Sequence, residues 1–309
     1  MPWRRARHSR NADARFARGL DDGETLTPDP APSPTPLAVR LGARLGRCPG
    51  VAAVTLGGSW ASGAADAGSD VDLGLYLDHM GRLDVARLQR LASEVDDRGD
   101  GAVVSRPGEW GPWVNGGAWL QVGGRRMDWI YRDLDLVART IEDLCDGRPA
   151  THFQVGHPAG FSTEIYAAEI HFGEVLFDAD GVIARLKSRL TPYPPRLRGA
   201  LIAGLWEARW LLDAAAPAAR RGDTHFVAGS AFRSVACAVQ ALFALNERYW
   251  LHEKGSVALV DGLDRKPEKF GVRVRAVLGG LGREPSELTS SLERLKEIVA
   301  EVEVLCGAR

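Results

Sequence analysis

The stretch that decides the fold of this chain reads Leu56-Gly57-Gly58-Ser59-Trp60-Ala61-Ser62-Gly63, followed by Gly68-Ser69-Asp70-Val71-Asp72-Leu73. The apolar run 51–56 before it predicts a short strand, and the run 71–77 predicts a second one. The glycine- and alanine-rich stretch 57–68 between them predicts a turn, in which a helix could begin after Ser59. Two strands joined by a glycine-rich turn are therefore expected.

Asp70 and Asp72 alternate with apolar residues on the second of these strands. Residues two apart on a strand point to the same face, so both carboxylates project together. Neighbouring carboxylates repel each other unless a cation lies between them, and Mg²⁺ prefers such hard oxygen ligands. The Gly58-Ser59 turn adds backbone N–H groups and a hydroxyl for phosphate oxygens. The combination predicts a phosphate cradle beside a metal site, and so points to nucleotidyl transfer.

Asp128 is the best candidate for a third carboxylate. It lies within Arg126-Met127-Asp128-Trp129-Ile130-Tyr131, where an unpaired charge between apolar neighbours would be costly. In a two-metal site this group can hold the second ion, or it can accept the proton of an attacking hydroxyl. The alternatives are a structural acid paired with Arg125 or Arg126, and, for the D-x-D pair alone, ordinary surface acids on a strand.

The glycine-serine turn, the alternating aspartates and the later Asp128 resemble the pattern of the DNA polymerase beta-type nucleotidyltransferase superfamily. The similarity covers roughly residues 51–131 and looks closest to the antibiotic (aminoglycoside-type) nucleotidyltransferases, and to uncharacterised bacterial proteins with the same domain. The resemblance implies that the three aspartates act in catalysis and bind two Mg²⁺ ions. It also implies that Gly58, Ser59 and Ser69 contact a nucleoside triphosphate, expected to be ATP.

The family's fold is α+β: a small palm, which is a mixed sheet with flanking helices, followed here by a C-terminal helical bundle. We therefore expect a basic arm and Pro-rich linker over residues 1–36, a nucleotidyltransferase domain over 37–192 and a helical domain over 193–309. Helices are predicted over 37–48, 83–95 and 133–145, a strand over 102–105 and a hairpin over 118–131. The stretch 162–172 fits either a strand or a helix.

Composition limits the setting of this protein. The chain has 309 residues, 45% of them hydrophobic, and a formal net charge of −1, which does not favour nucleic acid as a partner. The four cysteines lie far apart, without the spacing of a zinc site or a disulfide framework, so reduced thiols in the cytoplasm are expected. No apolar run approaches the length of a membrane span, so we expect no membrane contact.

Several residues outside the motif are candidates for the acceptor side or the nucleotide. Lys254 is expected to bind the nucleotide, because the helical domain of similar enzymes supplies basic groups there; a solvated lysine is the alternative. Asn246 could face the cleft or bond to a backbone group. Core packing is expected for Trp119. Trp110 and Trp113 are candidates for stacking on a base or a flat acceptor. The acids that could bind a cationic acceptor or replace Asp128 as the base are Glu109, Glu164 and Glu169.

The sequence thus predicts an Mg²⁺-dependent enzyme, monomeric or homodimeric, that moves AMP from ATP to a hydroxyl of a small aminoglycoside-like molecule, with a role in antibiotic resistance. Two alternatives remain. The acceptor could be RNA or a protein, as in toxin-like or regulatory members of the superfamily. The domain could also bind a nucleotide without turnover, although three retained aspartates argue against a binding-only module.

Overall fold

The computed structural model describes residues 36–63, 65 and 68–307, so nearly all of the predicted basic arm and linker lies outside the described residues. The strands are β1 (Val51–Leu56), β2 (Val71–Leu77), β3 (Gly117–Val122), β4 (Arg125–Asp133), β5 (Thr151–His152), β6 (Phe161–Ser162) and β7 (Glu174–Asp178). The first α-helices are α1 (Pro36–Leu45), α2 (Gly58–Ser62), α3 (Val85–Val95), α4 (Leu134–Cys145), α5 (Glu164–Phe172) and α6 (Val182–Arg189). The later ones are α7 (Pro195–Ala203), α8 (Trp206–Arg220), α9 (Thr224–Leu245), α10 (Ser256–Val260), α11 (Phe270–Gly279) and α12 (Pro285–Cys306). Two short 3₁₀ turns, η1 (Met80–Arg82) and η2 (Gly99–Gly101), flank α3.

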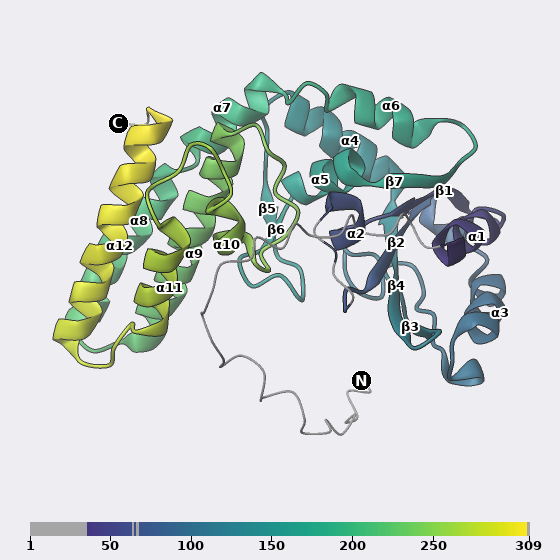
Figure 1. Ribbon diagram of the computed structural model, residues 1–309, viewed down its shortest axis with the longest axis horizontal. Helices are drawn as coiled ribbons and strands as arrows, with labels where there is room; N and C mark the ends of the chain where they lie inside the picture. The colour runs from purple at the N-terminus through teal and green to yellow at the C-terminus, as the bar shows by residue number, and fades with distance from the viewer. Residues whose placement is uncertain (1–35, 64, 66–67, 308–309) are drawn as a thin grey trace, which may run out of the picture. The chain divides into compact units, whose positions relative to one another are not determined.

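The main sheet is mixed and has five strands in the order β3-β4-β2-β1-β7 (Figure 1). The central pair β2 and β4 is parallel, and the other neighbours are antiparallel. Helices flank this sheet and the chain continues into a helical C-terminal region, which confirms the expected α+β class. The parallel pairing places the start of β2 beside the start of β4, where the predicted aspartates lie.

The two faces of β2 have different surroundings. Val71, Leu73 and Leu75 are buried in a core that they share with α1 and α3. Tyr76 points the other way, into a core that includes Ile165 of α5. Because side chains alternate along a strand, Asp72 lies on the same side as Tyr76. The acidic motif therefore faces the α5 side of the sheet.

The predicted strand over Ala102–Ser105 is wrong. Within the described chain, this stretch forms an isolated bridge from Val104 to Ala118. The Gln89 side chain accepts a hydrogen bond from the Val104 N–H at 3.0 Å and donates one to the Ala102 carbonyl at 2.8 Å. A side chain of α3 thus satisfies the backbone groups that a neighbouring strand would otherwise pair.

Two further elements differ from the expectation or complete it. The ambiguous stretch 162–172 contains helix α5, which is buried on most sides and so lacks a one-sided apolar stripe. Strand β7, which the sequence analysis did not predict, pairs with β1 at the edge of the sheet. Both elements are packed by residues distant in sequence, and such packing leaves little local periodicity.

The helical region packs around its long helices. Helices α8, α9 and α12 lie side by side (Figure 1), and their core continues into that of α5 and Tyr76. Contrary to the sequence expectation, α9 is long and apolar enough to cross a membrane by length and composition. This is weak evidence, because 61% of the apolar window is buried inside the protein and core helices pass the same test.

Candidate active site

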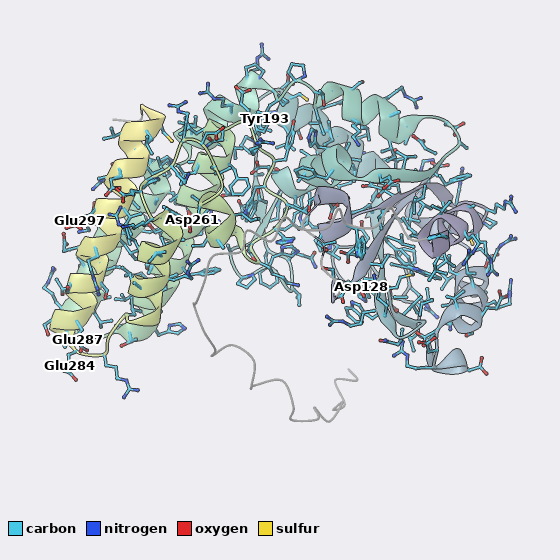
Figure 2. The ribbon with its side chains drawn as sticks, viewed as in Figure 1. Asp128, Tyr193, Asp261, Glu284, Glu287 and Glu297 are labelled. Atoms are coloured by element: carbon cyan, nitrogen blue, oxygen red, sulfur yellow. The ribbon has the colours of Figure 1, made fainter. Side chains whose placement is uncertain are left out.

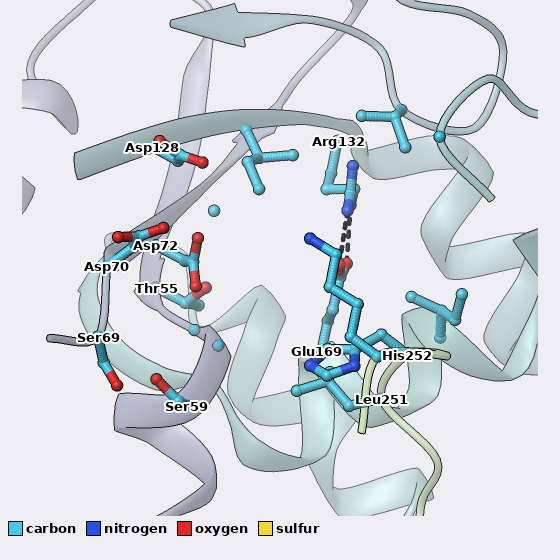
Figure 3. Close-up of a pocket in the computed structure, with 18 of the residues that line it drawn as sticks. Thr55, Ser59, Ser69, Asp70, Asp72, Asp128, Arg132, Glu169, Leu251 and His252 are labelled. Carbon is cyan, nitrogen blue, oxygen red and sulfur yellow. Dashed lines mark hydrogen bonds and ion pairs between the residues drawn. The ribbon is translucent and has the colours of Figure 1, made fainter. Parts of the chain in front are cut away.

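Asp72 and Asp128 occupy matching positions on two adjacent strands. In the parallel register of β2 and β4, Asp72 pairs directly with Asp128. Such partners place their side chains on the same face of the sheet, a few ångströms apart. Figure 2 labels Asp128 on this sheet, and Figure 3 shows Asp70, Asp72 and Asp128 gathered around one space. The structure therefore places all three predicted carboxylates in the wall of one pocket.

The glycine turn before α2 lies against Asp72. The Gly57 N–H donates a hydrogen bond to the Asp72 carbonyl at 2.8 Å. Gly58 has a φ of +60°, and a Cβ atom there would lie 1.8 Å from Asp72 Oδ2. Glycine is needed here both for the left-handed backbone and for the close approach. The Gly-Ser turn thus sets the position of the carboxylate as well as offering groups to a phosphate.

A pocket of about 550 Å³ contains this cluster. Its wall includes the predicted nucleotide-binding residues Gly58, Ser59, Ser69 and Lys254 together with the three aspartates. Lys254 comes from the segment 246–255 between α9 and α10, more than 120 residues after Asp128 in sequence. The other lining residues are Thr55, Gly57, Gly68, Gly74, Tyr76, Val114, Arg126, Ile130, Arg132, Gly156, His157, Ile165, Glu169, Leu251 and His252.

Negative charge in the pocket is only partly compensated. Burial, followed by the charges of Asp128, Asp70 and Glu169, raises the pKa of Asp72 to about 7, whereas Lys254 acts to lower it. Burial and then Asp70 raise the pKa of Asp128 to about 6, against the opposing charges of Arg126 and Lys254. Raised carboxylate pKa values mean that the charged forms are disfavoured as the side chains stand. A cation at this position would reverse that penalty.

Asp70 is turned toward a neighbouring arginine. Its Oδ1 lies 2.8 Å from Arg126 Nε, and the arginine side chain is 70% exposed. Across the described ranges, no three His, Cys, Asp or Glu side chains converge closely enough to form a ready metal site. An exposed pair of this kind is worth at most about 1 kcal/mol, so Asp70 can exchange its partner. In the sequence analysis, Asp128 was the alternative ion-pair partner of Arg126. In the structure, Arg126 pairs with Asp70 instead.

The wall opposite the aspartates holds an ion pair that the sequence analysis did not predict. Arg132 Nε and Nη2 donate to the two Glu169 oxygens at 2.7 and 2.5 Å, as the dashed lines in Figure 3 show. Arg132 is buried, whereas Glu169 remains partly accessible from the pocket. The period-two spacing of Asp128, Ile130 and Arg132 on β4 could have indicated the arginine. Glu169 was already a candidate acid, but no local signal placed it here.

The other candidates lie elsewhere. Trp119 is 60% exposed, so its predicted core packing is wrong; it stacks on Trp110 with ring centroids 4.3 Å apart. Trp113 stacks on His152 at 4.0 Å, outside the pocket wall. Asn246 hydrogen-bonds to backbone groups of Leu242 and Arg265, which settles its two alternatives in favour of the structural one.

Glu109 and Glu164 also lie outside the pocket wall. Glu109 accepts a hydrogen bond from the Arg106 N–H at 3.0 Å, and Glu164 is fully buried. Two histidines that no motif indicated, His157 and His252, do line the pocket. Burial lowers the pKa of each imidazole, which disfavours a positive charge on either histidine.

Two family models match separate parts of the chain. Residues 42–104 match a model described as a nucleotidyltransferase domain, and residues 163–254 match a domain of unknown function (DUF4037). A solved structure, that of a nucleotidyltransferase-like protein from Exiguobacterium sibiricum 255-15, is 10% identical and has a TM-score of 0.41. That alignment covers 88% of this chain and 76% of the other. No curated protein matches significantly.

Proposed function

We propose that this chain, which carries a nucleotidyltransferase domain of the DNA polymerase beta type, transfers AMP from ATP to a hydroxyl group of a small aminoglycoside-like molecule. The proposal depends on one observation. Asp72 and Asp128 are cross-strand partners on β2 and β4, and they line one pocket with Asp70 and the Gly58-Ser59 turn. The pocket volume lies within the usual range for small-molecule sites, roughly 300–1,000 Å³. The four cysteines are free, which supports a cytoplasmic setting.

Asp70, Asp72 and Asp128 are the residues that would hold two Mg²⁺ ions. The fit rests on the chemistry of the donor set: three carboxylates line one pocket, and two of them, Asp72 and Asp128, have a pKa raised by burial and by neighbouring carboxylates. Mg²⁺ prefers such oxygen ligands. When bound, the ions supply charge stabilisation at the attacking and leaving oxygens.

The residues of the chain perform the remaining tasks. The Gly58-Ser59 turn binds triphosphate oxygens, and Lys254, which lines the same pocket, balances their charge. Asp128 accepts the proton of the acceptor hydroxyl, whose oxygen forms a bond to the α-phosphorus while the bond to pyrophosphate breaks. A carboxylate within reach of the hydroxyl is a group suited to this role, and its ionised form is the one that can accept the proton.

Glu169 is the acid that we assign to the acceptor. Of the three spare acids considered from the sequence, it is the one whose side chain reaches the pocket. Its bidentate pair with Arg132 fixes the carboxylate in place. Each carboxylate oxygen has two lone pairs, so the group can still accept hydrogen bonds from an acceptor's ammonium or hydroxyl groups.

The test is a direct assay of transfer. The protein is incubated with ATP, Mg²⁺ and a panel of aminoglycosides, and pyrophosphate release is measured together with the mass of the modified acceptor. We expect the acceptor to gain the mass of one adenylyl group (AMP less water), and this gain to be lost in Asp72→Asn. Transfer to added RNA or protein instead would redirect the proposal to those acceptors. Nucleotide binding without any transfer would favour a non-catalytic module.

A further inference from the structure

The segment 246–255 is a connection without helix or strand that carries Leu251, His252 and Lys254 to the pocket. We refer to it as the Lys254 segment. Because it has no regular backbone ladder, the position of its side chains depends on contacts with the rest of the protein. Two such contacts, at Trp250 and Glu253, lie next to the pocket-lining residues in sequence.

The first contact lies beside Lys254. Glu253 Oε1 accepts a hydrogen bond from the Ala159 N–H at 2.8 Å. The Ala159 carbonyl in turn accepts one from Arg233 Nη1 of α9, also at 2.8 Å. This contact ties the end of the Lys254 segment to the loop after β5.

The second contact is Glu164, the first residue of α5. Its side chain is fully buried, accepts a hydrogen bond from the backbone N–H of Trp250, and lies 3.4 Å from the Tyr193 hydroxyl that donates to it. Figure 2 labels Tyr193 in the turn before α7. The second carboxyl oxygen, Oε2, is buried without a hydrogen-bond partner in the described chain. Trp250 and Tyr249 are themselves buried, and the Tyr249 hydroxyl donates to the Leu190 carbonyl.

An ionised carboxylate in this position would be costly. Among the described residues, no cation acts on Glu164. The titratable groups that face it there are Tyr193, before α7, and Tyr249, from the Lys254 segment. A buried charge without a cation partner is avoided by taking up a proton. Consistent with this geometry, burial raises the pKa of Glu164 to about 8.

We propose that Glu164 is a positioning residue: as a buried neutral acid it docks the Lys254 segment against α5, and its ionisation releases the segment. Glu164 and Lys254 both belong to the stretch 163–254 that matches a domain of unknown function. One role of this stretch would then be to hold Lys254 at the pocket. The effect on nucleotide binding rests on the proposed function, because it acts through Lys254. The docking itself does not.

Hydrogen–deuterium exchange of the full-length protein tests the docking. Protection of residues 249–254, corrected for intrinsic exchange rates, is measured from pH 7 to 9.5 in wild type, Glu164→Gln, Glu164→Ala and the exposed control Glu174→Gln. We expect wild type and the control to lose protection above pH 8, by up to about tenfold per pH unit. Glu164→Gln, which keeps an accepting oxygen but cannot ionise, should retain its protection. Identical loss in wild type and Glu164→Gln would overturn the proposal, even if Glu164→Ala does not fold.

Nucleotide affinity provides the second readout. In wild type, KM for ATP should rise between pH 8 and 9.5 with a smaller change in kcat, and Glu164→Gln should abolish that rise. An unchanged pH profile of KM in Glu164→Gln would refute the link to Lys254. If no variant binds a nucleotide, the proposed function fails while the exchange result still decides the docking.

Discussion

Replacing Gly58 with alanine should disable the site while leaving the protein folded. The new Cβ would lie 1.8 Å from Asp72 Oδ2, and the backbone at φ +60° adds strain. An alanine in this left-handed region costs about 1 kcal/mol. Because the clashing atom ends a side chain, Asp72 can rotate away for roughly 1 kcal/mol more. We therefore expect the free energy of unfolding to fall by about 2 kcal/mol. We also expect the Asp72 carboxylate to leave its position beside Asp128.

Gly63 is the matched control. It also has a positive φ, +75°, yet a Cβ there would meet nothing within 4 Å among the described residues. Gly63→Ala should thus lose about 1 kcal/mol from backbone strain alone. Urea unfolding measures both stabilities, and single-turnover AMP transfer measures the chemical step. We expect a rate loss of roughly 10²-fold or more in Gly58→Ala, on the scale of removing a transition-state-stabilising group, and little loss in Gly63→Ala. Equal rates in the two variants would refute the reasoning about Asp72.

Three further predictions concern charge and the N-terminal arm. Burial raises the pKa of Asp72 and Asp128 above their values in the unfolded chain, so the metal-free folded state binds more protons. Its free energy of unfolding should therefore fall as the pH rises from about 4 to 7. Asp72→Asn should reduce this fall by about 2 kcal/mol, as measured by urea titrations at the two pH values. Lys254→Ala should raise KM for ATP about tenfold without unfolding the protein, with partial recovery in Lys254→Arg; an unchanged KM would remove Lys254 from the nucleotide site. Deleting residues 1–36 should leave the rate of transfer to a small acceptor within about twofold of wild type. A basic arm adds mainly electrostatic affinity for RNA, which a small acceptor does not need.

The proposed donor half of the site was accessible from the sequence because its signals are local. The Gly58-Ser59 turn and the alternation of Asp70 and Asp72 depend on backbone geometry over a few residues, and the structure places all of them on one pocket. Asp128 was predictable as a charge within an apolar strand. The two wrong predictions, the strand over 102–105 and the core packing of Trp119, depend on long-range contacts. The Gln89 side chain takes the place of a strand partner of Val104. No local pattern distinguishes an exposed tryptophan from a buried one.

By itself, the sequence determined which residue types occupy β2 and the turn before α2, and so which chemistry the sheet could support. It could not determine that β4 lies parallel to β2 with Asp128 level with Asp72, because strand pairing is a contact between segments more than fifty residues apart. Nor could it bring the Arg132–Glu169 pair and the Lys254 segment to the same pocket. Those placements are decided by packing in the shared core, where side chains distant in sequence exclude water together, and only the tertiary structure contains that information.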